Sequence, residues 1–176
     1  MIAMTIAELR TLYDYSYWAN ARLFPVVLRL TTEQFTQALP GAYGSVRHTL
    51  VHMLSAEWGW LERTGGWPRG PKLDPGNFPT ALTIVEQWAH VEQHVRGFLD
   101  TLQDHDLKRE VAFAIGAGPQ HTLTIGQLLQ HAALHGVHHR GQLALLLRSL
   151  GAAPVEVDLL WYHLQARAAG GTISTP

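Results

Sequence analysis

The chain has 176 residues, of which 47% are hydrophobic and only 15% are charged, so it can bury the core of one domain. This composition excludes an extended disordered chain, which needs low hydrophobicity and high charge. The formal net charge is −1 and no long basic stripe is present, which argues against a sequence-independent grip on nucleic acid. Cysteine is absent, so disulfides, thiolate nucleophiles and cysteine metal sites are excluded as well.

The N-terminal sequence, MIAMTIAE, lacks the basic start and the continuous apolar run of a signal peptide. Apolar segments elsewhere are interrupted by polar residues well before the roughly 20 residues that a membrane span requires. We therefore expect a cytoplasmic protein that does not enter a membrane. Because so few charges are available to cover the surface, we also expect some apolar surface to lie in a subunit interface.

Apolar residues at three- and four-residue spacing predict a first helix over residues 5–29, and Pro25 predicts a kink or a restart near its end. A second helix is predicted from an N-cap at Ser45 to about residue 63. The connection that follows, residues 64–79, contains four prolines and four glycines. A connection of this length is typical of a functional lid or a mobile loop.

A third helix is predicted over residues 80–102, followed by an extended segment at 107–115 and a break at 116–119. Thr124 and Gln127 have the spacing of a capping box. They predict the start of a fourth long helix, which continues to about Leu150 and ends at the glycine after it.

A short helix is predicted over residues 157–168, and residues 169–176 are predicted to be a frayed tail. Four long amphipathic helices are typical of an antiparallel bundle. The predicted fold class is therefore all-α, a four-helix bundle of the up-down-down-up type with a short additional C-terminal helix. We expect a single domain over residues 1–168.

Histidine is unusually frequent, with 11 residues in the chain. At this frequency, chance predicts fewer than one pair of histidines four residues apart, whereas the sequence contains four. These pairs are His48/His52, His90/His94, His131/His135 and His135/His139. Three linked histidines on the fourth helix, with His138 beside them, are the strongest sign of a functional site.

Residues four apart in a helix lie on one face, so His135 and His139 can direct two imidazoles at one divalent cation. Their face continues the line of leucines that should point into the core. Burying several imidazoles without partners is costly, and coordination of a cation would satisfy them. The alternative is a hydrogen-bonded polar layer in the core or a solvated face.

A third ligand must come from another helix, and the second helix offers His48 and His52. We favour His52, because its helix face otherwise carries only small side chains: Ser45, Thr49, Ala56 and Gly59. Such a face either floors a cavity or lets a neighbouring helix approach closely. In the second case His52 would simply bond a backbone carbonyl.

The helix stripe that carries His135 and His139 also carries other polar residues, to which we assign structural or supporting roles. His131 and Gln142 lie on this stripe, where we expect them to orient the ligands, and the alternative for both is plain hydrogen bonding in the core. Arg140 points away from the stripe, and we expect it to form a structural ion pair, for instance with Asp158 or Glu57. The pair of histidines on the third helix is expected at the surface, and three isolated histidines are expected to be structural: His105, His121 and His163.

Residues 50–61 (LVHMLSAEWGWL) and residues 131–143 (HAALHGVHHRGQL) resemble the DinB/YfiT-like family. So do YSYWANARL at residues 15–23 and PVEVDLL at residues 154–160. The more specific part is an H-x-x-x-H motif followed by R-G-Q and paired with an earlier lone histidine. The likeness covers nearly the whole chain in the same order.

This resemblance implies a four-helix bundle, commonly a homodimer, with one divalent metal ion held by His52, His135 and His139. Zinc, nickel and ferrous iron all accept imidazole, and zinc or nickel is the expected ion. Three histidines leave at least one coordination position open, which is the pattern of a catalytic site. Many relatives carry an aromatic residue, often tyrosine, where this chain has His138. We therefore take His138 as the candidate catalytic residue, a proton relay, with a supporting group or an alternative ligand as the other interpretations.

Some relatives transfer low-molecular-weight thiols onto electrophiles or isomerise thiol adducts, and others are regarded as candidate hydrolases. The function implied is that of a metal-dependent thiol transferase or hydrolase acting on a small-molecule substrate. The alternative is a non-catalytic, stress-associated protein that binds a metal or a small ligand. A factor that acts directly on DNA is disfavoured by the net charge of −1.

Overall fold

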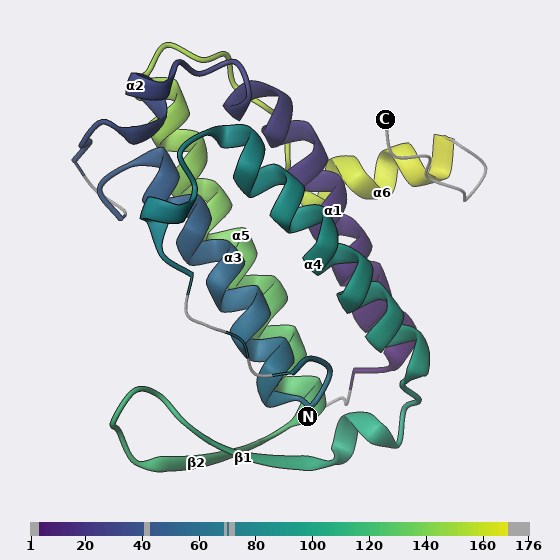
Figure 1. Cartoon of the computed structure of the whole chain (residues 1–176). Helices are drawn as coiled ribbons and strands as arrows, with labels where there is room; N and C mark the ends of the chain where they lie inside the picture. Colours follow the sequence, from purple (N-terminus) through teal and green to yellow (C-terminus); the bar gives the residue numbers. More distant parts are fainter. Residues whose placement is uncertain (1–3, 41–42, 69, 71–72, 169–176) are drawn as a thin grey trace.

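The computed structural model describes residues 4–40, 43–68, 70 and 73–168, and this part of the chain is mostly helical with one small sheet (Figure 1). Four long helices dominate: α1 (Ile6–Val27), α3 (Val46–Arg63), α4 (Ala81–Thr101) and α5 (Ile125–Ser149). Both α1 and α3 contact α4 and α5. In Figure 1, α1 and α5 run in one direction and α3 and α4 in the other, which is the order expected from the sequence.

The helix ends follow the signals in the sequence. The Thr124 hydroxyl accepts a hydrogen bond from the Gln127 backbone N–H, and the Gln127 side chain accepts one from the Thr124 backbone N–H. Ser45 caps α3 in the same manner by accepting from the backbone N–H of His48. The first helix continues through Pro25 and ends two residues later, so this proline marks the last turn rather than a restart.

A β-hairpin corrects the prediction of an all-α fold. Strand β1 (Glu110–Ala114) pairs antiparallel with β2 (Gln120–Thr124), and the turn includes Gly116 at a φ of 59°. The sequence predicts the first strand as an extended segment but misses its partner, because β2 is exposed along most of its length and has no apolar alternation. The hairpin leads directly into α5, since Thr124 is both the last residue of β2 and the N-cap of that helix.

Four short elements complete the described chain: α2 (Thr32–Thr36), the 3₁₀ helices η1 (Pro75–Asn77) and η2 (Asp106–Lys108), and α6 (Leu159–Ala168). The C-terminal helix packs on α1, where the Tyr162 ring lies 5.9 Å from that of Tyr15 and 5.8 Å from that of Trp18. The predicted frayed tail, residues 169–176, falls outside the described residues. None of the described helices combines the length and apolar character that a membrane span requires.

The prediction of an ion pair for Arg140 is wrong for the described part of the chain. The guanidinium is buried between α5 and α1, where Nη1 donates to Ser16 Oγ at 3.0 Å and to Asn20 Oδ1 at 3.2 Å. Neither Asp158 nor Glu57 comes within ion-pair distance among these residues. Neutral partners on α1 are closer to this face of α5 than either carboxylate.

Glu57 instead accepts two hydrogen bonds from buried aromatic side chains. The Tyr17 hydroxyl donates to Oε1 at 2.5 Å, and the Trp88 indole N–H donates to Oε2 at 3.0 Å. Burial raises the pKa of the Glu57 carboxyl despite these two donors, because desolvation penalises its charged form. This carboxylate therefore links α3 to α1 and α4 within the core.

Candidate metal centre

Two helices bring three imidazoles to one point, as the sequence predicts. His52 comes from α3, and His135 and His139 come from successive turns of α5. The Nε2 atom of His52 lies 3.2 Å from the Nε2 atoms of both His135 and His139, and those two are 3.0 Å apart. Among the described residues, this is the cluster of potential ligands that could hold a metal ion, and it contains no carboxylate.

A hydrogen bond to Gln142 sets the tautomer of His139. Gln142 Oε1 lies 2.7 Å from His139 Nδ1, and a carbonyl oxygen only accepts, so Nδ1 must carry the proton. In the neutral ring, Nε2 then presents a lone pair to the other two histidines. Gln142 therefore orients the His139 ring, which is one of the two roles considered for it from the sequence.

The spacing of the three nitrogens fits coordination of a common cation. Nitrogen ligands about 2.1 Å from one ion lie about 3.0 Å apart when their bonds are at right angles and about 3.4 Å apart in a tetrahedron. The observed separations of 3.0 and 3.2 Å fall within this range. Hydrogen bonding alone cannot account for all three short separations, because each Nε2 either donates or accepts. Two of the three atoms must therefore have the same role, and that pair lies close together without a hydrogen bond.

The site is arranged to keep its histidines neutral, which is the state that coordinates metal. Partial burial, together with the charges that His139 and His52 would carry, lowers the pKa of His135 to about 4. Burial also lowers the pKa values of His52 and His139, and for His139 the hydrogen bond to Gln142 opposes this shift.

Tyr43 is a residue of the site that the sequence analysis missed. Its ring stacks on that of His52 with centroids 3.8 Å apart and an interplanar angle of 19°, and it also lies 5.4 Å from the His139 ring. The side chain is 45% exposed, so it covers the outer side of the centre rather than filling the core. An aromatic residue next to Gly44, just before the helix that carries a ligand, is the signal that could have identified it.

The two other histidines of α5, His131 and His138, lie beside the three-histidine cluster. His138 is exposed, its ring centroid is 4.8 Å from that of His139, and its Nε2 lies 3.1 Å from the amide nitrogen of Gln142. The His131 ring lies 5.8 Å from that of His135 and packs edge-on against Trp60 at 4.8 Å. His131 thus extends the wall of the site along α5.

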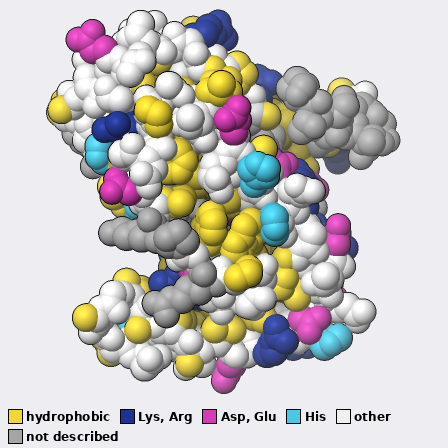
Figure 2. Space-filling view, viewed as in Figure 1, with side chains coloured by type: hydrophobic (Ala, Val, Ile, Leu, Met, Phe, Trp, Pro, Cys, Tyr) yellow, Lys and Arg dark blue, Asp and Glu magenta, His cyan; other side chains and the backbone are white. Residues whose placement is uncertain are grey.

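The structure agrees with the choice of His52 over His48 and with the surface position predicted for His90 and His94. His48 is exposed and bonds Ser45 through Nδ1 at 2.7 Å, so His52 is the residue of α3 that joins the cluster. His90 and His94 are exposed, and Figure 2 shows histidine side chains at the surface over α4. Trp67, from the Pro- and Gly-rich connection, lies 3.8 Å from the His94 ring. The three isolated histidines are also exposed: His105, His121 and His163.

The lowered pKa of His135 predicts a pH dependence of stability in the metal-free protein. The unfolded chain takes up a proton at this histidine below about pH 6.5, whereas the folded chain does so only near pH 4. The unfolding free energy should therefore fall as the pH decreases through this window, by about 1–2 kcal/mol after allowance for solvent screening at a half-buried group. Denaturant unfolding of wild type and His135→Gln at several pH values measures this contribution. The same dependence of unfolding free energy on pH in both proteins would contradict the lowered pKa of His135.

Comparisons with known proteins identify the family of this chain. The model of the DinB family matches residues 3–172. Protein DinB of Bacillus subtilis (strain 168) is 26% identical over 152 residues, which cover 84% of this chain and 88% of the relative. The uncharacterized protein YizA of the same strain is 23% identical over 150 residues, with 84% of this chain and 91% of the relative covered.

Two solved structures share the fold. A DinB-like protein from Bacillus cereus ATCC 10987 superposes with a TM-score of 0.71 at 23% sequence identity, covering 89% of this chain and 98% of that one. A DinB-like protein from Bacillus subtilis has a TM-score of 0.59 at 15% identity, with 82% and 95% covered. Because the family model spans nearly the whole chain, this protein belongs to the DinB family.

Proposed function

We propose that the three-histidine cluster binds one divalent metal ion and that the protein is a metal-dependent enzyme acting on a small molecule, most simply a thiol transferase or a related hydrolase. The observation that carries this proposal is the convergence of three Nε2 atoms within 3.2 Å of one another, without a carboxylate among the described ligands. Three neutral imidazoles do not reduce the charge of the ion and leave part of its coordination sphere open.

Zinc and nickel are the ions we propose, and ferrous iron also accepts this donor set. Such an ion, when bound, lowers the pKa of a thiol or a water at its open position and thereby supplies a nucleophile near neutral pH. The protein's own part is to keep His52, His135 and His139 neutral and to hold His139 in one tautomer through Gln142.

His138 is the proposed acid–base residue. Its exposed ring lies beside His139, and its Nε2 accepts a hydrogen bond from the Gln142 amide, because the other end of that amide accepts from His139. In the neutral ring the proton therefore sits on Nδ1. A proton can leave from Nδ1 of His138 without disturbing His139, the metal ligand that Gln142 orients.

Metal content tests the centre directly. We expect elemental analysis of the purified protein to find close to one divalent ion per chain, and His135→Ala or His139→Ala to lose it.

Gln142→Leu should weaken metal affinity about 10- to 100-fold, because it frees the His139 ring. The ion should also be released as the pH falls below about 6, since only neutral imidazole coordinates. His90→Ala, an exposed histidine outside the cluster, is the matched control, and an ion retained by His52→Ala/His135→Ala would refute the assignment.

Activity distinguishes the enzyme from the non-catalytic alternative. Metal-loaded protein incubated with bacillithiol, mycothiol or glutathione and a generic electrophile should form product, and removal of the metal should abolish it. His138→Gln should reduce the rate by about 10²–10⁴-fold while leaving metal content unchanged, which is the range for loss of a general acid or base. Inactivity with every thiol and with ester substrates, in protein that holds its metal, would support a binding protein instead.

We further propose that the protein is a homodimer built on the antiparallel four-helix bundle that the contacts of the long helices support. Apolar side chains are exposed on one stripe of α5 and again on α6. On α5 they are Leu134, Val137 and Leu145, and on α6 they are Leu159, Leu160, Trp161 and Leu164. Exposed apolar patches of this kind mark interaction surfaces, and a second copy is the partner proposed here.

Sedimentation equilibrium tests the dimer. The wild-type chain should have twice the monomer mass, and Leu145→Glu should shift it to the monomer, because a carboxylate at a 69%-exposed position is tolerated in the monomer but not in an apolar interface. Leu82→Glu, at a 52%-exposed position on α4, is the control and should remain dimeric. A monomeric wild type, or a Leu145→Glu protein that stays dimeric, would exclude this interface.

A further inference from the structure

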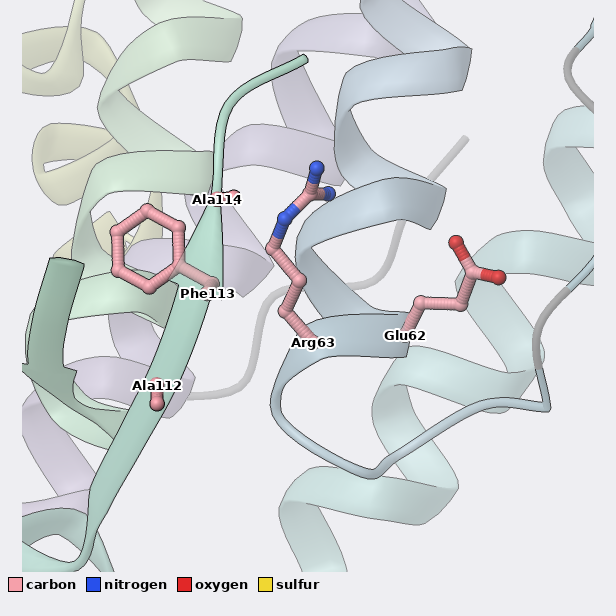
Figure 3. Close-up of a pocket in the computed structure, with 5 residues that line it drawn as sticks. All are labelled: Glu62, Arg63, Ala112, Phe113 and Ala114. Atoms are coloured by element: carbon pink, nitrogen blue, oxygen red, sulfur yellow. The ribbon is translucent and has the colours of Figure 1, made fainter. Parts of the chain in front are cut away.

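A hollow lies farther along α3 than the three-histidine cluster, between the C-terminal turn of that helix and the β-hairpin (Figure 3). It has a volume of about 340 Å³, and its described lining consists of Glu62 and Arg63 from α3 and Ala112, Phe113 and Ala114 from β1. In Figure 3 the Arg63 side chain extends into the space between α3 and β1, whereas Glu62 points away from it. The hollow therefore presents one cationic group.

The Arg63 guanidinium is held in place, but only one of its nitrogens donates a hydrogen bond to a described residue. Its Nη1 donates to the carbonyl of Gly59 at 2.7 Å, and the group lies over the Trp60 ring at 4.9 Å. Within the described residues, no carboxylate is within 4.0 Å of it and no other hydrogen bond engages it. The edge formed by Nε and Nη2 is thus left to bind a planar anion such as a carboxylate with two parallel hydrogen bonds.

A glycine at position 59 makes this placement of Arg63 possible. A Cβ atom there would lie 3.0 Å from Nη1, which is tighter than an ordinary contact. The side chain therefore folds back along α3, toward the turn that precedes it. Gly59 is seven residues after His52, so the residue whose carbonyl holds the guanidinium is about 10 Å from His52 along the helix axis.

A continuous aromatic wall connects the hollow with the metal centre. The Trp60 ring lies 5.6 Å from Phe113, which lines the hollow, and 4.8 Å from His131. His131 in turn lies 5.8 Å from His135, one of the three clustered histidines. A ligand that occupies both places would run along this wall.

We propose that Arg63 binds the carboxylate of a low-molecular-weight thiol whose sulfur lies at the three-histidine centre, so that the preferred thiol carries a carboxylate about 10 Å from its sulfur. The inference rests on the proposed function, because it assigns a binding group to the carboxylate end of the thiol that the proposed function places at the metal ion. A single arginine with one free edge matches the single charge and planar shape of a carboxylate better than a doubly charged phosphate.

Calorimetric titration of the zinc-loaded protein with matched thiols tests the proposal. In 8-mercaptooctanoate the carboxylate is about 10 Å from the sulfur, in 3-mercaptopropionate it is much closer, and 8-mercaptooctan-1-ol has no charge. Arg63→Ala should weaken binding of 8-mercaptooctanoate about tenfold or more, as loss of a charge-assisted bidentate pair requires. Binding of the two other thiols should not change.

Two further variants separate ligand binding from a structural role of Arg63 at the end of α3. Arg63→Lys keeps a cation at the helix C-terminus and should unfold at the wild-type denaturant concentration, but it should bind 8-mercaptooctanoate more weakly because lysine lacks the planar fork. Arg167→Ala, an exposed arginine of α6, is the control and should bind as the wild type does.

The outcomes distinguish this inference from the proposed function. Equal binding of 8-mercaptooctanoate by wild type and Arg63→Ala, or a wild type that does not prefer it over the neutral thiol, would overturn the role of Arg63. If no thiol binds the zinc-loaded protein, the thiol chemistry itself fails. In that case octanoate added to metal-free protein still tests the hollow, because a shift of the Arg63 Nε–H resonance in the NMR spectrum reports carboxylate binding there.

Discussion

The antiparallel packing of α3 against α5 is the interaction on which the candidate centre depends. His52 is 83 residues from His135 and 87 from His139 in sequence, and only this packing places their nitrogens within 3.2 Å. Small side chains allow the approach, since Ser45 and Thr49 on α3 are buried. The core on the other side of α3 holds the two helices in register, because Leu50 and Leu54 are completely buried there.

The polar groups of α5 act on two opposite sides of the helix. On one side, Gln142 orients His139 toward His52 on α3. On the other, the buried Arg140 donates to Ser16 and Asn20 on α1. The hydrogen bonds on each side are made only when α5 has one rotation about its axis, so both networks favour that rotation. The direction of the imidazoles thus depends on contacts with both neighbouring helices.

The β-hairpin packs against the C-terminal end of α3, next to the start of α5. Phe113 is 8% exposed and packs edge-on against Trp60, so the hairpin is anchored on α3 rather than projecting freely. At the other end of the centre, Tyr43 stacks on His52. Aromatic rings therefore lie next to histidines at both places, with Tyr43 against His52 and Trp60 against His131.

The sequence by itself determined the helices and most of the candidate ligands, because helix caps and four-residue spacing are local properties of the chain. Ser45, Thr124 and the pair His135 and His139 are examples. The choice of His52 over His48 also agrees with the structure, although its reason, a face of small residues, anticipates contact with another helix. Tertiary structure alone decided the second strand of the hairpin, the neutral partners of Arg140, and the stacking of Tyr43 on His52. Each depends on which side chains from distant segments meet, and neither periodicity nor spacing carries that information.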